Sequence, residues 1–154
     1  MATAPQLTHF TYEPDSDNPG WCRWLMPDTA RFNDAVLGKQ IVRVEAPETA
    51  RLRMFPQTLH TNAGNKVHGG ITLAFADVAL FAALYALRGI DAGRSVTVDL
   101  SAQFIGGGDP SRPLDAVVDL LRETRHLAFL RGLIVQDDDI VASFSGTVRK
   151  PTMT

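Results

Sequence analysis

The longest apolar segment of the sequence spans residues 71–87 and reads ITLAFADVALFAALYAL. Only Thr72 and Asp77 in it are clearly polar, and alanine and leucine, two residues that favour helix, make up most of the rest. Arg88 places a cation in the last turn, and Gly89 is of the residue type that commonly follows a helix. We therefore expect one long helix here.

The apolar character of this helix raises the question of a membrane span. A transmembrane helix needs about 20 predominantly apolar residues, and a charge at its centre is costly. Residues 71–87 are slightly short, carry Asp77 in the middle, and lie between two halves of the chain that are rich in strand patterns. We therefore expect a buried helix of a globular protein, with no membrane as partner.

Strand patterns occur on both sides of the helix. In residues 96–104 apolar and polar side chains alternate, so one face of this strand is expected to be buried and the other polar. A short helix is expected over residues 28–37, with Asp28 as its N-cap and Gly38 after its end. The strands are expected at residues 41–44, 50–55, 96–104, 114–122, 127–135 and 140–148, joined by short polar turns.

These elements define an expected fold. A helix that is apolar on all sides must be covered on all sides. A strongly curved antiparallel sheet of about six strands, wrapped around the long central helix, is the most economical cover, so the expected fold class is α+β. A sheet in a chain of 154 residues leaves part of such a helix uncovered. We expect a second subunit to cover it, in a homodimer or a larger homo-oligomer.

Composition limits the class of function. The 154 residues fit one domain, and 15 Lys and Arg against 17 Asp and Glu do not give the basic surface that nucleic-acid binding requires. The single cysteine, Cys22, has no disulfide partner within the chain, and the first ten residues lack a basic start followed by an apolar run. We therefore expect a cytoplasmic protein that does not bind nucleic acid.

Composition also divides the chain into three parts. Residues 1–27 contain four prolines and are interpreted as an irregular leader. Trp21 and Trp24 within it are large and apolar, so the second half of the leader is expected to pack on the domain. Residues 28–150 form the domain, and residues 151–154 form a short tail.

Asp77 is the anomaly in the central helix. A carboxylate among apolar residues costs several kcal/mol unless it is hydrogen-bonded or faces a wet cleft. It is either a core aspartate that binds a neighbouring hydroxyl group, or a general base or nucleophile held where substrate reaches it. The sequence pattern alone leaves both interpretations open.

A polar, glycine-containing loop, residues 60–70 (HTNAGNKVHGG), leads directly into the helix. Free backbone N–H groups at a helix N-terminus can hydrogen-bond a carbonyl oxygen that gains negative charge. Gly69 and Asp77 are eight residues apart in the sequence, which corresponds to about 12 Å along one helix, so one small reacting group cannot easily touch both. Two antiparallel helices across a two-fold axis would bring them together, which predicts two composite sites per dimer.

The motifs VHGGITLAFADVAL (residues 67–80) and SVTVDLSAQFI (residues 95–105), with Asn62 upstream, resemble the hotdog-fold acyl-CoA thioesterases. The resemblance is to the phenylacetyl-CoA thioesterase-like branch of the 4-hydroxybenzoyl-CoA thioesterase superfamily and covers residues 28–150. It implies a central helix wrapped by an antiparallel sheet, usually in a dimer of dimers. It also implies hydrolysis of an aromatic or medium-chain acyl-CoA, as substrate rather than cofactor, to a free acid and CoA.

The resemblance assigns roles to residues of the loop, the helix and the following strand. Asp77 would be the general base or nucleophile, and the Gly69 N–H would polarise the thioester carbonyl. Asn62 would position the water or the carbonyl, and Thr97 would lie near the attacking water. His68 would brace the loop or transfer a proton.

Contacts to the rest of the substrate follow from the same resemblance. Gly70, beside Gly69, would let the acyl group approach the backbone. Coenzyme A would cross the surface near the loop that begins at Gly106 and the turn over residues 122–127, where Arg125 and His126 are candidate phosphate contacts. The candidates for the acyl pocket, which are also typical core residues, are Phe75, Leu80 and Phe81.

Two other functions remain open. One is a hotdog enoyl-CoA hydratase or dehydratase, since His68 with Asp77 could form the histidine–carboxylate pair that such enzymes need. The other is a non-catalytic acyl-CoA-binding scaffold. A serine hydrolase is disfavoured because the sequence lacks Gly-x-Ser-x-Gly, and the histidines have no partners at metal-binding spacing, so neither a metal nor a cofactor is expected.

Overall fold

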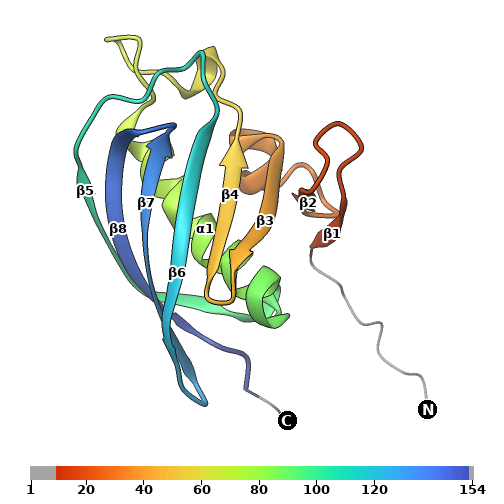
Figure 1. Cartoon of the computed structure of the whole chain (residues 1–154). Helices are drawn as coiled ribbons and strands as arrows, with labels where there is room; N and C mark the ends of the chain where they lie inside the picture. Colours follow the sequence, from red (N-terminus) through yellow and green to blue (C-terminus); the bar gives the residue numbers. More distant parts are fainter. Residues whose placement is uncertain (1–9, 153–154) are drawn as a thin grey trace.

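The structure is a computed structural model, and it describes residues 10–152. In these residues one long helix lies against one antiparallel sheet of eight strands (Figure 1). The strands are β1 (Thr11–Pro14), β2 (Cys22–Leu25), β3 (Gln40–Ala46), β4 (Thr49–Met54), β5 (Val96–Phe104), β6 (Leu114–Glu123), β7 (Leu127–Gln136) and β8 (Asp139–Arg149). The helix is α1 (Gly69–Arg88), and the short helical turns are η1 (Asn33–Leu37), η2 (Thr58–His60) and η3 (Ala92–Arg94).

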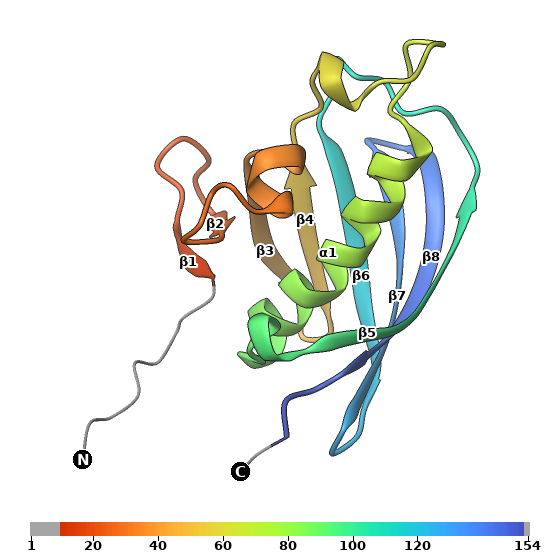
Figure 2. The same cartoon turned by 180° about the vertical axis from the view of Figure 1, so that it is seen from behind.

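The strand order in the sheet is β1-β2-β3-β4-β6-β7-β8-β5. Helix α1 crosses one face of this sheet. The edge strand β5 starts near the C-terminal end of the helix and curves along one side of it (Figure 2). The predicted α+β class, with a long central helix and a curved antiparallel sheet, is confirmed. The sheet has eight strands rather than about six because the leader adds β1 and β2 to the six strands that were predicted.

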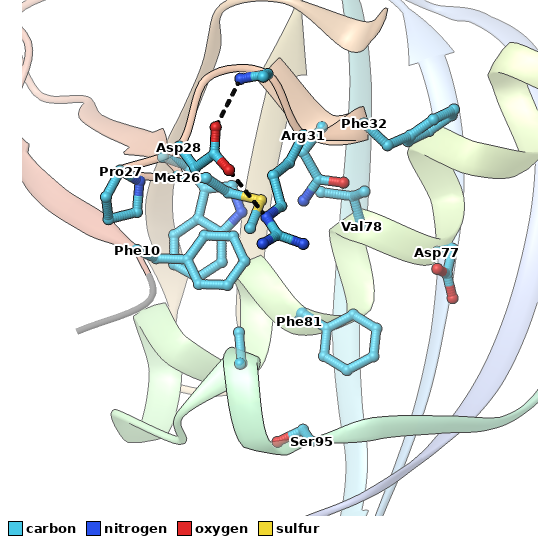
Figure 3. Close-up of a pocket in the computed structure, with 15 residues that line it drawn as sticks. Phe10, Met26, Pro27, Asp28, Arg31, Phe32, Asp77, Val78, Phe81 and Ser95 are labelled. Atoms are coloured by element: carbon cyan, nitrogen blue, oxygen red, sulfur yellow. Dashed lines mark hydrogen bonds and ion pairs between the residues drawn. The ribbon is translucent and has the colours of Figure 1, made fainter. Parts of the chain in front are cut away.

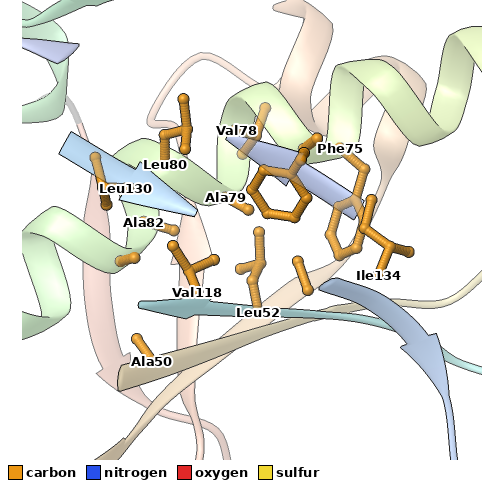
Figure 4. Close-up of a cluster of buried hydrophobic side chains, with 14 of the residues drawn as sticks. Ala50, Leu52, Phe75, Val78, Ala79, Leu80, Ala82, Val118, Leu130 and Ile134 are labelled. Carbon is orange, nitrogen blue, oxygen red and sulfur yellow. The ribbon is translucent and has the colours of Figure 1, made fainter. Parts of the chain in front are cut away.

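The predicted long helix is confirmed. The side chain of His68 caps its N-terminus, and Gly89 ends it in the left-handed conformation with a φ of 65°. By length and a mean hydropathy of 1.9 this helix could span a membrane, yet half of that stretch is buried inside the domain. It is therefore the helix that packs in the hydrophobic core, against the sheet. Its buried residues pack against side chains of the sheet such as Ala50, Leu52, Val118, Leu130 and Ile134 (Figure 4).

The leader differs from the prediction. Within its described part, β1 and β2 pair with each other, and β2 also pairs with β3, so the expectation of irregular structure is wrong for these residues. The predicted packing of its tryptophans is confirmed, because Trp21 lies beneath the guanidinium groups of Arg43 and Arg53, while Trp24 stacks on Phe10 with 4.4 Å between ring centroids. The packing of its two tryptophans on other side chains thus accompanies strand pairing in a segment that contains several prolines.

The short helix predicted over residues 28–37 is largely wrong. Asp28 does accept a hydrogen bond from the backbone N–H of Ala30, at 3.1 Å, but this closes only a turn. Helical structure is confined to η1, and Gly38 follows it with a φ of 76°.

Strand β5 contains a bulge that the sequence pattern did not reveal. Leu100, pairing with Gly146 of β8, faces α1, because a Cβ atom on Gly146 would lie 2.5 Å from the Leu80 side chain. The register shifts between Thr97 and Asp99, and N-terminal to the shift Thr97 faces the helix. The expected unbroken alternation of a buried apolar face and a polar face is therefore wrong. The apolar residues Val96, Val98 and Phe104 are 44%, 56% and 56% exposed.

One stripe of α1 is left uncovered by the sheet. Leu73 is 39% exposed, and Asp77 and Phe81 are half-buried. These residues follow one another at intervals of four, so they share a face of the helix. The predicted incomplete cover of the helix is present in the single chain, and it lies beside the edge strand β5.

Candidate active site

Asp77 lies halfway along α1, on the uncovered stripe. The hydroxyl group of Thr97, on β5, donates a hydrogen bond of 2.7 Å to Oδ1 of Asp77. Asp77 also lines an open pocket of about 990 Å³ (Figure 3). Both interpretations of this residue are thus partly met: it binds a neighbouring hydroxyl group, and it is open to a cavity that a substrate can enter.

The loop before the helix is held together by Asn62. Its side-chain oxygen accepts hydrogen bonds from the backbone N–H groups of Gly64 and Lys66, at 3.0 and 3.1 Å. Its own N–H donates to the carbonyl oxygen of Lys66 at 2.8 Å. The amide oxygen of Asn62 therefore shapes the loop, and its amide nitrogen is the group that remains for a substrate or water.

His68 and the two glycines form the start of α1. The Nδ1 atom of His68 accepts a hydrogen bond of 2.8 Å from the N–H of Gly70, so that N–H is already engaged. The N–H of Gly69 has no hydrogen-bond partner within residues 10–152. The ring of Phe104 lies 3.6 Å from where a Cβ atom on Gly69 would be, so an apolar wall borders this free donor.

The structure does not bring Gly69 and Asp77 together within one chain. Both belong to α1, with seven residues between them, so at the helical rise they lie about 12 Å apart along its axis. His68 and Asp77 are separated by slightly more, so the histidine–carboxylate pair of a hydratase is not formed within the chain.

The two regions predicted to contact coenzyme A lie at opposite ends of the sheet of one chain. Gly106 follows the C-terminal end of β5, which is at the same end as the start of β6, because each of the pairs β6–β7, β7–β8 and β8–β5 is antiparallel. Arg125 and His126 follow the other end of β6 (Figure 1). A ten-residue strand is about 33 Å long, so a single chain cannot place them side by side.

Of the predicted acyl-pocket candidates, only Phe81 lines the pocket beside Asp77, because Phe75 and Leu80 are fully buried in the core. The opposite wall of the pocket is made by the leader and the turn after it, with Phe10, Arg31 and Phe32 (Figure 3). Sequence reasoning missed this wall, since nothing in the pattern of a proline-containing leader indicates that it returns to the middle of the helix.

Asp34 lies next to the pocket and is a partly buried acid. Asp34, next to the pocket-lining Asn33, accepts a hydrogen bond from the N–H of Met26 at 2.9 Å, yet its other oxygen is buried without a partner within residues 10–152. Burial raises the pKa of Asp34 above its ordinary value of 3.8.

In the described part of the chain, His, Cys, Asp and Glu form no group of three or more that could hold a metal ion.

A family model described as the acyl-CoA thioesterase N-terminal domain matches residues 58–149. This range contains the loop before the helix, α1, β5 and the candidate coenzyme A contacts Arg125 and His126, whereas Phe10, Arg31 and Phe32 of the opposite pocket wall precede it. No curated protein matches the sequence of this chain.

Solved structures share the fold. Zebrafish thioesterase superfamily member 2 is 26% identical, with a TM-score of 0.67 over 79% of this chain and 88% of that chain. The Escherichia coli PaaI protein from the phenylacetic acid degradation operon is 20% identical, with a TM-score of 0.68 over 80% and 87%. A hypothetical thioesterase from Streptococcus pneumoniae, solved with coenzyme A, is 14% identical, with a TM-score of 0.67 over 77% and 91%. The chain therefore belongs to the acyl-CoA thioesterase family, has the hotdog fold and is a thioester hydrolase.

Proposed function

We propose that the protein hydrolyses an aromatic or medium-chain acyl-CoA to the free acid and CoA, with Asp77 as the general base or nucleophile. The observation that carries this proposal is the Asp77 carboxylate, held by Thr97 at the side of an open pocket. The second oxygen of Asp77 accepts no hydrogen bond within residues 10–152, so it is available to a water molecule or to a carbonyl carbon.

The proposed reaction needs two groups. Asp77 either accepts a proton from a water molecule that attacks the carbonyl carbon, or attacks that carbon itself to form an anhydride that water then hydrolyses. The carbonyl oxygen gains negative charge in either step and is stabilised by the free Gly69 N–H at the positive end of the helix dipole. The carbon–sulfur bond breaks as the tetrahedral intermediate collapses, to the free acid when water attacks or to the anhydride when Asp77 attacks, and the CoA thiolate leaves and takes up a proton.

A second copy of the chain completes the proposed site. Strand β5 is an edge strand, and its exposed apolar side chains lie beside the uncovered stripe of α1. If β5 pairs antiparallel with β5 of the second copy, the two α1 helices also run antiparallel, so Gly69 of one approaches Asp77 of the other. The same symmetry brings the Arg125–His126 turn of the second copy to the end of the sheet where Gly106 lies.

The remaining parts of the proposal follow from this arrangement. We propose a homodimer or a dimer of dimers in the cytoplasm, with CoA thioester as substrate and no further cofactor. Asn62, His68 and Gly70 position the loop around the carbonyl group, and Arg125 and His126 contact the phosphates of CoA.

The test is the substitution Asp77→Asn, which preserves size and removes the basic carboxylate. Release of free thiol from phenylacetyl-CoA and from acyl-CoAs of six to ten carbons is followed colorimetrically. Turnover is expected to fall by about 10²-fold or more, while Asp138→Asn, at the exposed tip between β7 and β8, retains it. Unchanged turnover in Asp77→Asn would contradict the assignment.

Two further outcomes separate the other functions. Hydration of crotonyl-CoA without thiol release would identify a hydratase. Binding of acyl-CoA by the wild-type protein, without turnover of any thioester, would identify a scaffold.

A further inference from the structure

The pocket beside Asp77 has aromatic walls from three separate parts of the chain. Phe81 comes from α1, Phe32 from the turn before η1, and Phe10 from the leader, just before β1 (Figure 3). Phe10 is fixed from behind by its stacking on Trp24, which is 1% exposed. The pocket is therefore a built cavity with apolar sides and an open mouth.

A single cation, Arg31, lines this pocket among the described residues. Its guanidinium group points into the pocket, between the rings of Phe10 and Phe81 in the view of Figure 3. Its Nε atom contacts the Asp28 carboxylate at 3.2 Å, but its two terminal nitrogens form no hydrogen bond within residues 10–152. These nitrogens can therefore bind a carboxylate in the two-point geometry that arginine favours.

The contact between Asp28 and Arg31 does not prevent Arg31 from binding a carboxylate of the substrate. Both side chains are exposed, and an exposed ion pair of this kind contributes little free energy. Asp28 also accepts a hydrogen bond from the N–H of Ala30, so it is held in place by the turn and leaves the far side of the guanidinium group open.

Resting on the proposed function, we propose that Arg31 makes the enzyme selective for acyl groups that carry a carboxylate at the end distant from the thioester. The thioester lies at Asp77, the methylene or aryl part lies between the aromatic rings, and the distal carboxylate binds the terminal nitrogens of Arg31. An acyl group with an apolar end would instead desolvate a guanidinium group without giving it a partner, which is unfavourable.

This selectivity belongs to the leader and the turn after it, and not to the matched family domain. The family model covers residues 58–149, whereas Phe10, Arg31 and Phe32 precede that range. The chemistry and the recognition of the acyl end are thus carried by different segments.

The test compares adipyl-CoA with hexanoyl-CoA, which have equal chain length and differ in the distal carboxylate. The ratio of their kcat/KM values is measured for the wild type, for Arg31→Met, which keeps length without charge, and for Arg94→Met, a surface control outside the pocket. We expect the wild type and Arg94→Met to prefer adipyl-CoA. Arg31→Met is expected to lose this preference by about tenfold or more, through kcat/KM for adipyl-CoA, with hexanoyl-CoA changed by less than about threefold.

A binding measurement separates failure of this inference from failure of the proposed function. Dissociation constants of both thioesters are determined by calorimetry with Asp77→Asn, alone and combined with Arg31→Met, so that no turnover is needed. A preference for adipyl-CoA that disappears with Arg31 supports the inference even if the wild type proves inactive. Equal preference with and without Arg31 overturns it, while thiol release from hexanoyl-CoA would leave the proposed function standing.

Discussion

Thr97 donates its hydroxyl hydrogen to Oδ1 of Asp77 over 2.7 Å, which links the edge strand β5 to the middle of the central helix. This contact depends on the bulge between Thr97 and Asp99, which turns Thr97 toward α1. One side of the Asp77 carboxylate is thereby fixed in direction, and its other oxygen accepts no hydrogen bond within residues 10–152.

Replacement of Thr97 by valine tests this positioning role. Valine keeps the shape of threonine and lacks the hydroxyl group, so the Asp77 carboxylate keeps its charge but loses the one hydrogen bond that it accepts within residues 10–152. We expect kcat to fall roughly 10- to 100-fold, the loss of a hydrogen bond to a charged group, with KM little changed. Thr97→Ser retains the hydroxyl group and is expected to restore kcat. A serine variant as slow as the valine variant would contradict the role.

The cap formed by His68 leads to a second prediction. His68→Ala removes the acceptor of the Gly70 N–H and is expected to lower the free energy of unfolding by about 1 kcal/mol. Asparagine is a good N-cap, so His68→Asn is expected to restore both stability in urea and turnover. Restored stability without turnover would show that His68 transfers a proton instead.

A third prediction concerns pH and stability. The pKa of Asp34 is raised by burial, so folding favours its protonated form; that contribution is complete below about pH 4 and is lost as the pH rises through the raised pKa. Asp34→Asn keeps an oxygen for the Met26 N–H and removes the buried charge. Its melting temperature is expected to exceed that of the wild type at pH 7 and to converge with it near pH 4. The exposed Asp138→Asn variant is the control, and an equal difference at both pH values would be inconsistent with this account.

The edge strand supplies a fourth prediction. Val98, in the bulge of β5, is 56% exposed, and Val98→Asp places a charge where the second copy is proposed to pair. We expect a monomer by light scattering, with loss of thiol release because each site needs two chains. Val44→Asp changes a residue that is 47% exposed on β3, away from this edge, and should leave the assembly intact. An unchanged oligomer in Val98→Asp would place the interface elsewhere.

Lys66 gives a fifth prediction. Its aliphatic stem lies 3.2 Å from where a Cβ atom on Gly107 would be, and it forms no salt bridge within residues 10–152. Its ammonium group lies in the loop that precedes the helix, where it can attract the CoA phosphates. Lys66→Met is expected to raise KM for acyl-CoA several-fold and to leave KM for the same acyl group on pantetheine unchanged.

The same pair of substrates tests Arg125 and His126, the phosphate contacts predicted from sequence. A KM increase confined to acyl-CoA in Arg125→Met or His126→Ala would support their proposed role in the dimer. An equal KM increase with both substrates would count against a phosphate contact.

Much of the fold could be predicted because its signals are local. Residues 71–87 are apolar and rich in alanine, and the domain strands alternate or are short apolar runs between turn residues. Strands β1 and β2 have four residues each, and the contacts that hold them on the domain join residues far apart in sequence, such as Trp24 with Tyr85 and Trp21 with Arg53. No local pattern contains that information.

The candidate site likewise has a part that could be predicted from the sequence and a part that could not. Asp77, Gly69 and Asn62 could be singled out because a carboxylate in an apolar helix and a glycine-containing loop before it are visible in the sequence. The engagement of the Gly70 N–H by His68 follows from the geometry of the cap, and the place of Arg31 follows from the path of the leader. Both are results of folding rather than of residue spacing.

The residues that form the leader wall of the pocket are separate in sequence from those that hydrolyse the thioester. Selectivity for the acyl group and catalysis can therefore change independently in evolution. Changes among residues 10–33 can retune which acid is released, while the carboxylate, the helix start and the edge strand remain as they are. Trp21 packs under the guanidinium groups of Arg43 and Arg53 and holds that stretch on the sheet. New substrate preferences can therefore arise there without changes to the catalytic residues.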